Sequence, residues 1–328
     1  MTTDSSASAL DSAIDTARLD LDSHALRIVR AVADHGSITQ AARALGYSQP
    51  AISQHLKRLE ARLGMPVVAR VGRGVRLTEA GRVLARHANT VTTALDAAAG
   101  ELADLQGLRS GRVRLAAFPS ASSTLVPRLL GTMGATHPGV RITYTEAEPP
   151  EAVAAVRKQS ADLAITFSYP GDRVDPHRES ARGLAVIPVW RDEMLLVLPS
   201  GHPLADAESI DLADLAGEAW IAGCPRCRGH LLELTDARDF VPRIAYETDN
   251  FVAVVSMVAE GVGVALIPSL AVGSAGRMAG VVVRPTINHD HRTINLVGAT
   301  GADQVPAIAT TASALLALDA GEWSLAAV

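Results

Sequence analysis

The stretch "SITQAARALGYSQPAISQHLKRLEARLG", residues 37–64, holds two short helical patterns separated by a Gly-Tyr-Ser break. Ser37 is a favoured N-cap residue for the first helix, and Gly46 suits the left-handed exit that ends it. Ser48 can cap the second helix, and Pro50 falls in its first turn, where a missing N–H group costs nothing. The pattern predicts two short helices joined by a tight turn.

The second of these helices has one apolar and one polar face. Ile52, Leu56, Leu59 and Leu63 recur at steps of 4, 3 and 4 residues and form one narrow stripe. Outside the stripe lie Gln49, Pro50, Ser53, Gln54, Lys57 and Arg58. Amide, hydroxyl and cationic groups of this kind bind base edges and phosphates in the major groove. The pattern favours a helix-turn-helix that reads DNA, although an ordinary helical hairpin has the same periodicity.

Charge is distributed unevenly along the 328 residues, whose net charge is −5. Residues 24–110 carry +6, whereas residues 1–23 carry −4 and residues 111–328 carry −7. A positive segment in an acidic chain favours a polyanionic partner such as nucleic acid. Residues 1–20 are rich in aspartate and are predicted to be a disordered acidic tail. They lack the basic and apolar regions of a secretory signal. With no apolar run near the roughly 18 residues of a membrane span, we expect a cytoplasmic protein without a membrane partner.

A β-hairpin is predicted after the helices. In "MPVVARVGRGVRLT", residues 65–78, two apolar runs flank Gly72-Arg73-Gly74. Arg70 and Arg73 would lie beside the second helix and contact phosphate, or the tip would simply be solvated. The segment therefore predicts a winged helix-turn-helix over residues 21–78.

Residues 21–78 resemble the DNA-binding domain of LysR-type transcriptional regulators. The pieces "GSITQAARALGYSQPAISQHLKRLEARLG", "VVAR" and "LTEAG" stand in the order and spacing of that family. The resemblance implies double-stranded promoter DNA as a partner and allows RNA polymerase as a second one. The DNA-binding residues that we expect are Ser37, Thr39, Ser48, Gln49, Pro50, Ser53, Gln54, Lys57, Arg58, Arg70 and Arg73.

A long helix is predicted over residues 79–107, with Thr78 as its cap. Its apolar positions recur at alternating steps of 4 and 3 residues: Leu84, Ala88, Val91, Leu95, Ala98, Leu102 and Leu105. Such a heptad seam favours a dimerising linker helix, and the alternative is a helix packed on its own chain. The resemblance implies a homodimer or homotetramer, so that the DNA site is an interrupted inverted repeat.

Strands and helices alternate from residue 112 onward, which favours parallel βαβ units. The resemblance implies a two-lobed α/β effector-binding domain like that of periplasmic binding proteins. We expect lobe one to hold residues 112–189 and 268–328, and lobe two to hold residues 190–267. The expected fold class is therefore α+β and multi-domain: an N-terminal winged helix-turn-helix, a linker helix and this C-terminal domain.

Ligands of open α/β sheets bind at the carboxyl ends of strands, beside helix N-termini. The resemblance places the cleft between the lobes there, with a small organic effector, often a carboxylate. The effector-binding residues that we expect are Ser120, Ser122, Ser123, Thr166, Phe167, Gly223, Asn250 and Phe251. Plain N-capping of helices is the alternative role for the polar members.

Cys224 and Cys227 form a C-x-x-C pair, with His230 three residues further on. The pair could be redox-active, could line the pocket or a plain loop, or could be part of a zinc site that lacks a fourth local ligand. We expect no metal and no cofactor.

Motifs of catalysis are missing from the sequence, which has no G-x-S-x-G elbow and no P-loop. We therefore expect a protein that is not an enzyme: a LysR-type regulator that controls promoter activity in response to a small effector. A redox-sensing LysR-type regulator acting through Cys224 and Cys227 is the alternative. The rival class is a solute-binding or enzymatic protein with an incidental helical front end.

Overall fold

The structure is a computed structural model that describes residues 21–71, 74–105, 111–171, 183–274 and 279–328, apart from the side chains at 96, 100, 101 and 103–105. The chain folds into two compact units, residues 1–95 and residues 96–328. The acidic tail and Arg73, both assigned roles from sequence, lie outside the described residues. No helix in the described part of the chain is both long enough and apolar enough to span a membrane.

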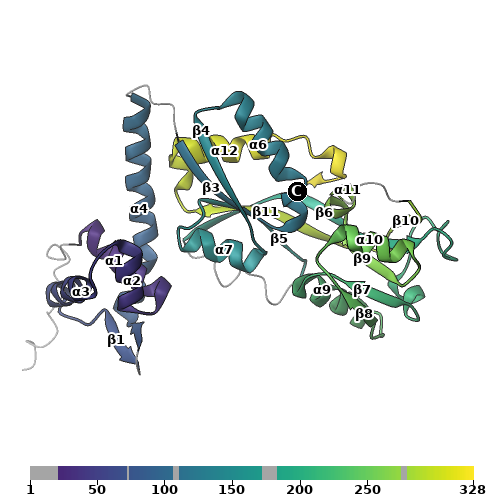
Figure 1. Ribbon diagram of the computed structural model, residues 1–328, viewed down its shortest axis with the longest axis horizontal. Coiled ribbons are helices and arrows are strands. Elements are labelled where there is room, and N and C mark those ends of the chain that lie inside the picture. The colour runs from purple at the N-terminus through teal and green to yellow at the C-terminus, as the bar shows by residue number, and fades with distance from the viewer. Residues whose placement is uncertain (1–20, 72–73, 106–110, 172–182, 275–278) are drawn as a thin grey trace, which may run out of the picture. The chain divides into compact units, whose positions relative to one another are not determined.

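The first unit is a winged helix-turn-helix (Figure 1). Its elements are α1 (Ser23–His35), α2 (Ile38–Leu45), α3 (Gln49–Leu63), β1 (Val68–Val71), β2 (Gly74–Leu77) and the start of α4 (Glu79–Leu105). The predicted caps are confirmed: Ser37 accepts from the Gln40 N–H and Ser48 from the Ala51 N–H, each at 3.4 Å. Gly46 ends α2 in the left-handed region at φ 72°.

The core of this unit is built from the apolar stripes of its helices. Ile52, Leu56 and Leu59 of α3 are at most 2% exposed. They pack with α1 and with the first turns of α4, including Leu84 and Ala88. The predicted stripe is therefore the side of α3 that faces the protein, and its polar side faces outward.

The second unit is built on two sheets that share one strand. The elements of the first sheet are β3 (Gly111–Ala117), β4 (Val140–Glu146), β5 (Leu163–Ser168), β11 (His291–Ala299), β12 (Ala326–Ala327) and the first half of β6 (Leu184–Pro199). The second half of β6 pairs with β9 (Val264–Pro268) and β10 (Val281–Pro285), and β7 (Ala219–Ala222) and β8 (Arg243–Glu247) complete the second sheet. The strand order is β4-β3-β5-β11-β6-β9-β7-β8.

Parallel pairing, predicted for the whole domain, holds only within two groups of strands. β3 is parallel to β4 and β5, and β7 is parallel to β8 and β9. β11 runs antiparallel to β5 and β6, and β6 runs antiparallel to β9 and β10. The sheets are therefore mixed.

Helices cover both faces of the sheets. They are α5 (Pro119–Ser122), α6 (Leu125–Thr136), α7 (Pro149–Arg157), α9 (Pro225–Asp236), α10 (Phe251–Ala259), α11 (Ser269–Ser274) and α12 (Pro306–Leu316). Figure 1 shows α6 and α12 on one face of the first sheet and α7 on the other. Each lobe has its own core, one beneath α6 and α12 and others around β6, β7 and β9.

The boundary between the lobes differs from the expected one. The first passage lies near Asp192 in the middle of β6, close to the predicted residue 190. The return was predicted at Pro268, but β10 pairs with residues 195–199 of β6 on the second sheet. The chain therefore returns to lobe one near Asp290, where β11 begins, because the segment after α11 first adds an edge strand to lobe two.

Candidate functional site

The outward face of α3 presents the polar residues predicted from sequence. Gln49, Pro50, Gln54, Lys57 and Arg58 are exposed, and Ser53 is half-buried. The Gln49 side-chain amide donates to the Ser53 hydroxyl at 2.9 Å, which holds both groups on one patch. Ser37 and Ser48 are used as helix caps, and Thr39 and Arg70 are exposed.

The wing is held against α3 by a carboxylate that sequence reasoning missed. Glu60 Oε1 accepts from the backbone N–H groups of Val67 and Val68, at 2.8 and 3.2 Å. On the other side, a Cβ atom at Gly81 would lie 2.2 Å from the Val67 carbonyl oxygen. A glycine at the start of α4 therefore allows that helix to approach the wing closely.

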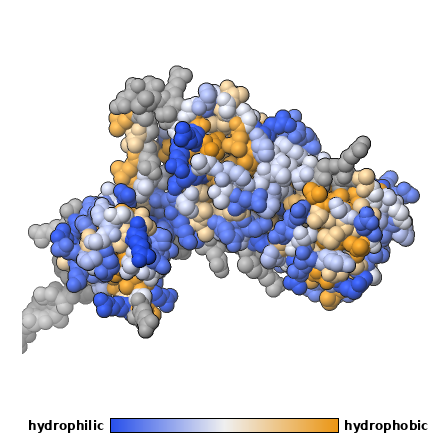
Figure 2. Space-filling model, in the orientation of Figure 1, coloured by the Kyte–Doolittle hydropathy of each residue, from blue (hydrophilic) through white to orange (hydrophobic). Residues whose placement is uncertain are grey.

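The seam of α4 divides into two parts. Leu84 and Ala88 are buried in the core of the first unit, as the alternative of packing on the same chain requires. Further along, Leu95 and Leu102 are 52% and 60% exposed. Figure 2 shows hydrophobic residues on the surface of this later part of α4. That part has an apolar stripe without a partner among the described residues of this chain.

A cleft in the second unit is walled by both lobes. Its lining residues are Phe118, Pro119, Ser120, Glu148, Phe167, Met194, Ile221, Gly223, Cys224, Cys227, Asp249, Phe251, Val254, Leu266, Ile267, Pro268 and Arg292. Of the residues predicted for effector binding, Ser120, Phe167, Gly223 and Phe251 lie here, together with both cysteines. The enclosed space between these residues has room for about one water molecule.

Four of the predicted effector residues lie outside the cleft lining because the fold itself uses their polar groups. Ser122 donates to the Phe118 carbonyl at 2.9 Å and accepts from the Tyr144 hydroxyl. Ser123 donates to the Ser120 carbonyl at 3.1 Å. Thr166 is fully buried on β5, and Asn250 caps α10 through its side-chain oxygen.

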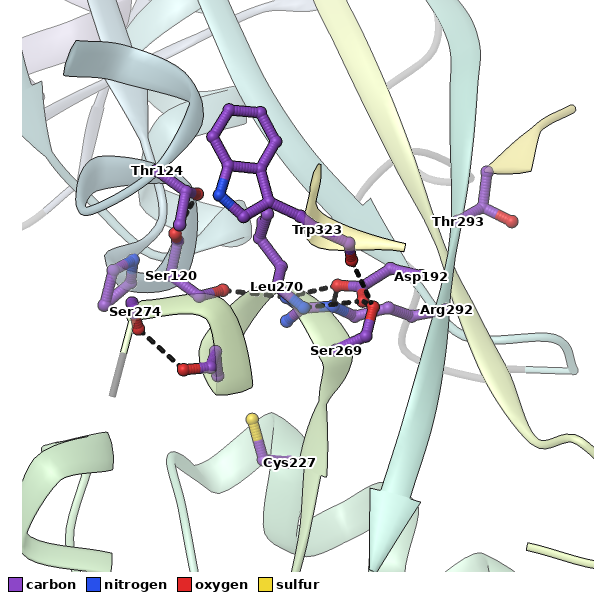
Figure 3. A network of polar contacts seen from close by, with 12 residues as sticks. Ser120, Thr124, Asp192, Cys227, Ser269, Leu270, Ser274, Arg292, Thr293 and Trp323 are labelled. Carbon is purple, nitrogen blue, oxygen red and sulfur yellow. Dashed lines mark hydrogen bonds and ion pairs between the residues drawn. The ribbon is translucent and has the colours of Figure 1, made fainter. Parts of the chain in front are cut away.

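Arg292, which lines the cleft, forms a buried ion pair with Asp192 that the sequence did not predict (Figure 3). Arg292 of β11 and Asp192 of β6 are direct cross-strand partners, and their side chains are 2% and 0% exposed. Arg292 donates from Nε to Asp192 Oδ2 and from a terminal nitrogen to the Ser120 hydroxyl, each at 2.8 Å. Asp192 also accepts from the Ser269 hydroxyl at 2.8 Å and from the Leu270 N–H at 3.1 Å. The guanidinium charge is therefore already neutralised within the protein.

Aromatic rings complete the surroundings of Arg292. Its guanidinium carbon lies 4.4 Å from the centre of the Phe167 ring and 4.8 Å from that of Phe118. Cation–π contacts of this kind favour the charged form of arginine in a dry site. Arg292 is thus fixed in position by a carboxylate, a hydroxyl and two rings.

The two cysteines are free thiols at the start of α9. Their sulfur atoms lie 2.8 Å apart, and the Cys227 N–H donates to the Cys224 sulfur at 3.3 Å. The hydrogen bond to Cys227 and burial raise the pKa of the Cys224 thiol. The same hydrogen bond, with help from the Arg292 charge and Tyr169, lowers the pKa of the Cys227 thiol against the effect of burial. The two thiols are therefore chemically unequal.

The cysteine pair is not part of a larger cluster of possible metal ligands in the described ranges, where no group of three or more His, Cys, Asp or Glu side chains is placed to hold a metal ion. His230, the third residue of the partial zinc pattern, stacks on Tyr169 with ring centres 3.8 Å apart.

Comparison with known families agrees with this architecture. The family described as "Bacterial regulatory helix-turn-helix protein, lysR family" matches residues 23–82, and "LysR substrate binding domain" matches residues 106–319. A "Probable RuBisCO transcriptional regulator" of Synechocystis sp. is 34% identical over 190 residues, which span 58% of this chain and 53% of that protein. This chain therefore matches only about half the length of that relative.

Two OxyR proteins match over more of their length. The "DNA-binding transcriptional dual regulator OxyR" of Escherichia coli is 29% identical over 280 residues, 83% of this chain and 87% of that protein. Among solved structures, a full-length OxyR variant of Pseudomonas aeruginosa superposes with a TM-score of 0.65 at 21% identity, covering 91% of this chain and 96% of that one. At this identity the second likeness supports the fold alone.

Proposed function

The chain belongs to the LysR family, and we propose that it is a DNA-binding transcriptional regulator that a small molecule controls through the cleft of its second unit. The observation that carries this proposal is the exposed polar face of α3, on a capped helix of a segment with net charge +6. A DNA-binding regulator acts where the chromosome lies, so we place it in the cytoplasm, with RNA polymerase as a further partner.

The chemistry of α3 suggests how bases are read. A glutamine amide can form two hydrogen bonds with the edge of adenine, and a serine hydroxyl can bond to several bases. The bond between Gln49 and Ser53 would then be exchanged for bonds to DNA. Lys57, Arg58 and Arg70 are exposed cations that would contact phosphate, and Arg73 has the same proposed role.

The apolar stripe of α4 supports a symmetric assembly. Leu95 and Leu102, both more than half exposed, would be covered by the same helix of a second copy. A two-fold dimer presents two α3 helices, so we propose an interrupted inverted repeat as its DNA site. A tetramer would then be a dimer of such dimers.

A gel-shift titration on the promoter upstream of the chain's own gene tests the DNA-binding proposal. Gln49→Ala should lose discrimination between the site and scrambled DNA while weak, salt-sensitive binding stays. Gln304→Ala, an exposed glutamine of the second unit, is the control. Full discrimination by Gln49→Ala would refute the reading role of this residue, and a parent protein that ignores all duplex DNA at low salt would refute the function.

The electrostatics of the cleft bear on the class of effector. Among the lining residues Arg292 is the cation, and it is paired with Asp192, whereas Glu148 and Asp249 are acidic. Burial and the charge of Asp249 raise the pKa of Glu148. A neutral ligand with hydrogen-bond donors therefore fits this cleft better than the carboxylate expected from the family resemblance.

A second candidate, redox control through Cys224 and Cys227, is favoured by one specific observation. The two sulfur atoms lie 2.8 Å apart in the wall of the cleft, so disulfide formation needs only a small local shift. If a Cys224→Ser variant keeps the full promoter response, this candidate is eliminated.

A further inference from the structure

Three aromatic rings of the first unit form a cluster where α3 begins. His24 lies in the first turn of α1, Tyr47 in the turn between α2 and α3, and His55 on α3. The ring centre of His24 lies 5.5 Å from that of Tyr47 and 4.8 Å from that of His55, and both pairs meet edge to face. The centres of the Tyr47 and His55 rings are 6.5 Å apart. The cluster therefore joins three separate segments of the helix-turn-helix.

This cluster reaches the surface of the protein. Tyr47 is 45% exposed, and His24 and His55 are half-buried. The Tyr47 N–H donates to the Ala42 carbonyl at 2.8 Å, which fixes the turn that carries the tyrosine ring. Tyr47 stands two residues before Gln49, the first residue of α3. A proton on either imidazole would therefore add positive charge beside the helix that we propose reads DNA.

Charged groups surround the two histidines on α1 and α3. Arg58 and Arg62 follow His55 by three and seven residues, which places them on the same side of α3. Arg62 forms an exposed ion pair of 3.0 Å with Asp22, the N-cap residue of α1. The carboxylate that lies two residues before His24 is therefore already paired with a cation.

The charge of His24 is felt by this carboxylate. A backbone N–H of α1 and the side chain of Arg62 lower the pKa of Asp22 most, and the charge of His24 lowers it further. Arg27, three residues after His24 on α1, and Arg43, in the last turn of α2, are exposed cations of the same unit. Positive charge thus dominates around the rings, and DNA phosphates would neutralise it.

We infer that His24 and His55 form a proton-binding site that couples the affinity of the first unit for DNA to pH. The inference rests on the proposed DNA-binding function. Imidazole changes its charge between about pH 5 and pH 8. Phosphates brought beside α3 stabilise an imidazolium, so the complex binds a proton more tightly than the free protein does. Two imidazolium charges whose rings are 4.8 Å apart repel each other, so the pair takes up one proton and not two.

Proton uptake makes DNA binding tighter in acid. By the reciprocity of linked binding, DNA that tightens proton binding about tenfold is itself bound about tenfold more tightly by the protonated protein. Operator affinity should therefore rise by about tenfold between about pH 8 and pH 5.5. The imidazolium also adds a cation near the phosphates, so the slope of log K against log salt should steepen by up to about 1 over the same range.

Operator binding measured across this pH range tests the proton site. Full-length protein is titrated into a fluorescent duplex of the promoter upstream of its own gene, at constant salt, and anisotropy is followed. His24→Gln combined with His55→Gln should lose the rise in affinity. His35→Gln combined with His87→Gln removes two exposed histidines of the same unit and should keep it. An equal pH dependence in the two double variants would overturn the inference.

Calorimetry measures the proton uptake of the parent protein and needs no variant. The parent is titrated with the same duplex at several pH values, in two buffers that differ in ionisation enthalpy, and the difference in binding heat gives the protons taken up. We expect a maximum of about half a proton per subunit, which is what a tenfold difference in proton affinity gives. No uptake at any of these pH values would overturn the inference, even where the double variant fails to fold.

Failure of this inference is distinguishable from failure of the proposed function. A parent protein that binds its operator with the same affinity at every pH overturns the inference and leaves the regulator intact. A parent protein that ignores duplex DNA at low salt, at every pH, refutes both.

Discussion

Replacing Asp192 with leucine would leave the charged guanidinium of Arg292 buried without its counter-ion. The pair is 2.8 Å apart, and neither side chain is more than 2% exposed. Removing one partner of a buried ion pair costs about 3–5 kcal/mol, because the remaining charge is uncompensated. The N–H of Leu270 loses its acceptor as well, whereas the hydroxyl of Ser269 keeps the Trp323 carbonyl at 3.0 Å. We expect Asp192→Leu to be among the most destabilising single changes in the second unit.

The assay can be confined to that unit. All three tryptophans, Trp190, Trp220 and Trp323, belong to residues 96–328, so the thermal transition of tryptophan fluorescence reports on it alone. A loss of 1 kcal/mol lowers the Tm of a unit of this size by about 2–4 °C. The loss at Asp192 therefore predicts a Tm lower by roughly 6–20 °C.

Two comparisons make this prediction refutable. Glu322→Ala breaks an exposed pair with Arg128, and should cost at most about 1 kcal/mol. In the double variant Asp192→Leu with Arg292→Met no buried charge remains, so its Tm should exceed that of Asp192→Leu. A Tm of Asp192→Leu equal to that of Glu322→Ala, or a double variant less stable than Asp192→Leu, would refute the reasoning.

Three further outcomes are expected. Glu60→Ala leaves the N–H groups of Val67 and Val68 without their acceptor, so the free energy of unfolding of the first unit, followed by helix circular dichroism, should fall by about 1–3 kcal/mol. Glu60→Gln keeps an acceptor and should lose less, and equal losses in the two variants would contradict this explanation. Burial raises the pKa of Glu148 above its ordinary 4.5, so the ionised carboxylate destabilises the folded state at pH 7. Glu148→Gln should therefore raise the Tm at pH 7, and this gain should vanish as the pH falls below 4.5. A gain in Tm that persists in acid would contradict this prediction. Lys57→Ala should reduce the slope of log K against log salt for operator binding by about 1, and an unchanged slope would remove it from the phosphate contacts.

The first unit was predictable because its signals are local. Ser37, Gly46 and Ser48 each act within four residues of their own position, and the stripe of α3 is visible in the spacing of its leucines. Glu60 was missed because its acceptor role depends on the backbone of Val67 and Val68, seven and eight residues further along the chain. Spacing patterns on a helix do not show which exposed carboxylate the next segment will use.

The cleft was less predictable because long-range pairing assembles it. Arg292 and Asp192 are one hundred residues apart in sequence and meet only because β11 pairs antiparallel with β6. A strand with one arginine gives no sign that this side chain is buried. Of the polar residues near strand ends, Ser120 lines the cleft, but the side chains of Ser122 and Asn250 are already hydrogen-bonded to the backbone. Local sequence cannot decide between capping a helix and facing a ligand.

The two chain segments that connect the lobes are paired with each other, and this pairing limits how the lobes can move. Glu193 is the cross-strand partner of His291, and the Met194 N–H donates to the Asp290 carbonyl at 2.7 Å, so the two connecting segments form a paired ribbon. Such a ribbon resists sliding but can twist. Asp192 lies within this pair of connecting segments, next to Glu193. A ligand that altered the contacts of the Arg292–Asp192 pair would therefore act directly on the two segments that connect the lobes.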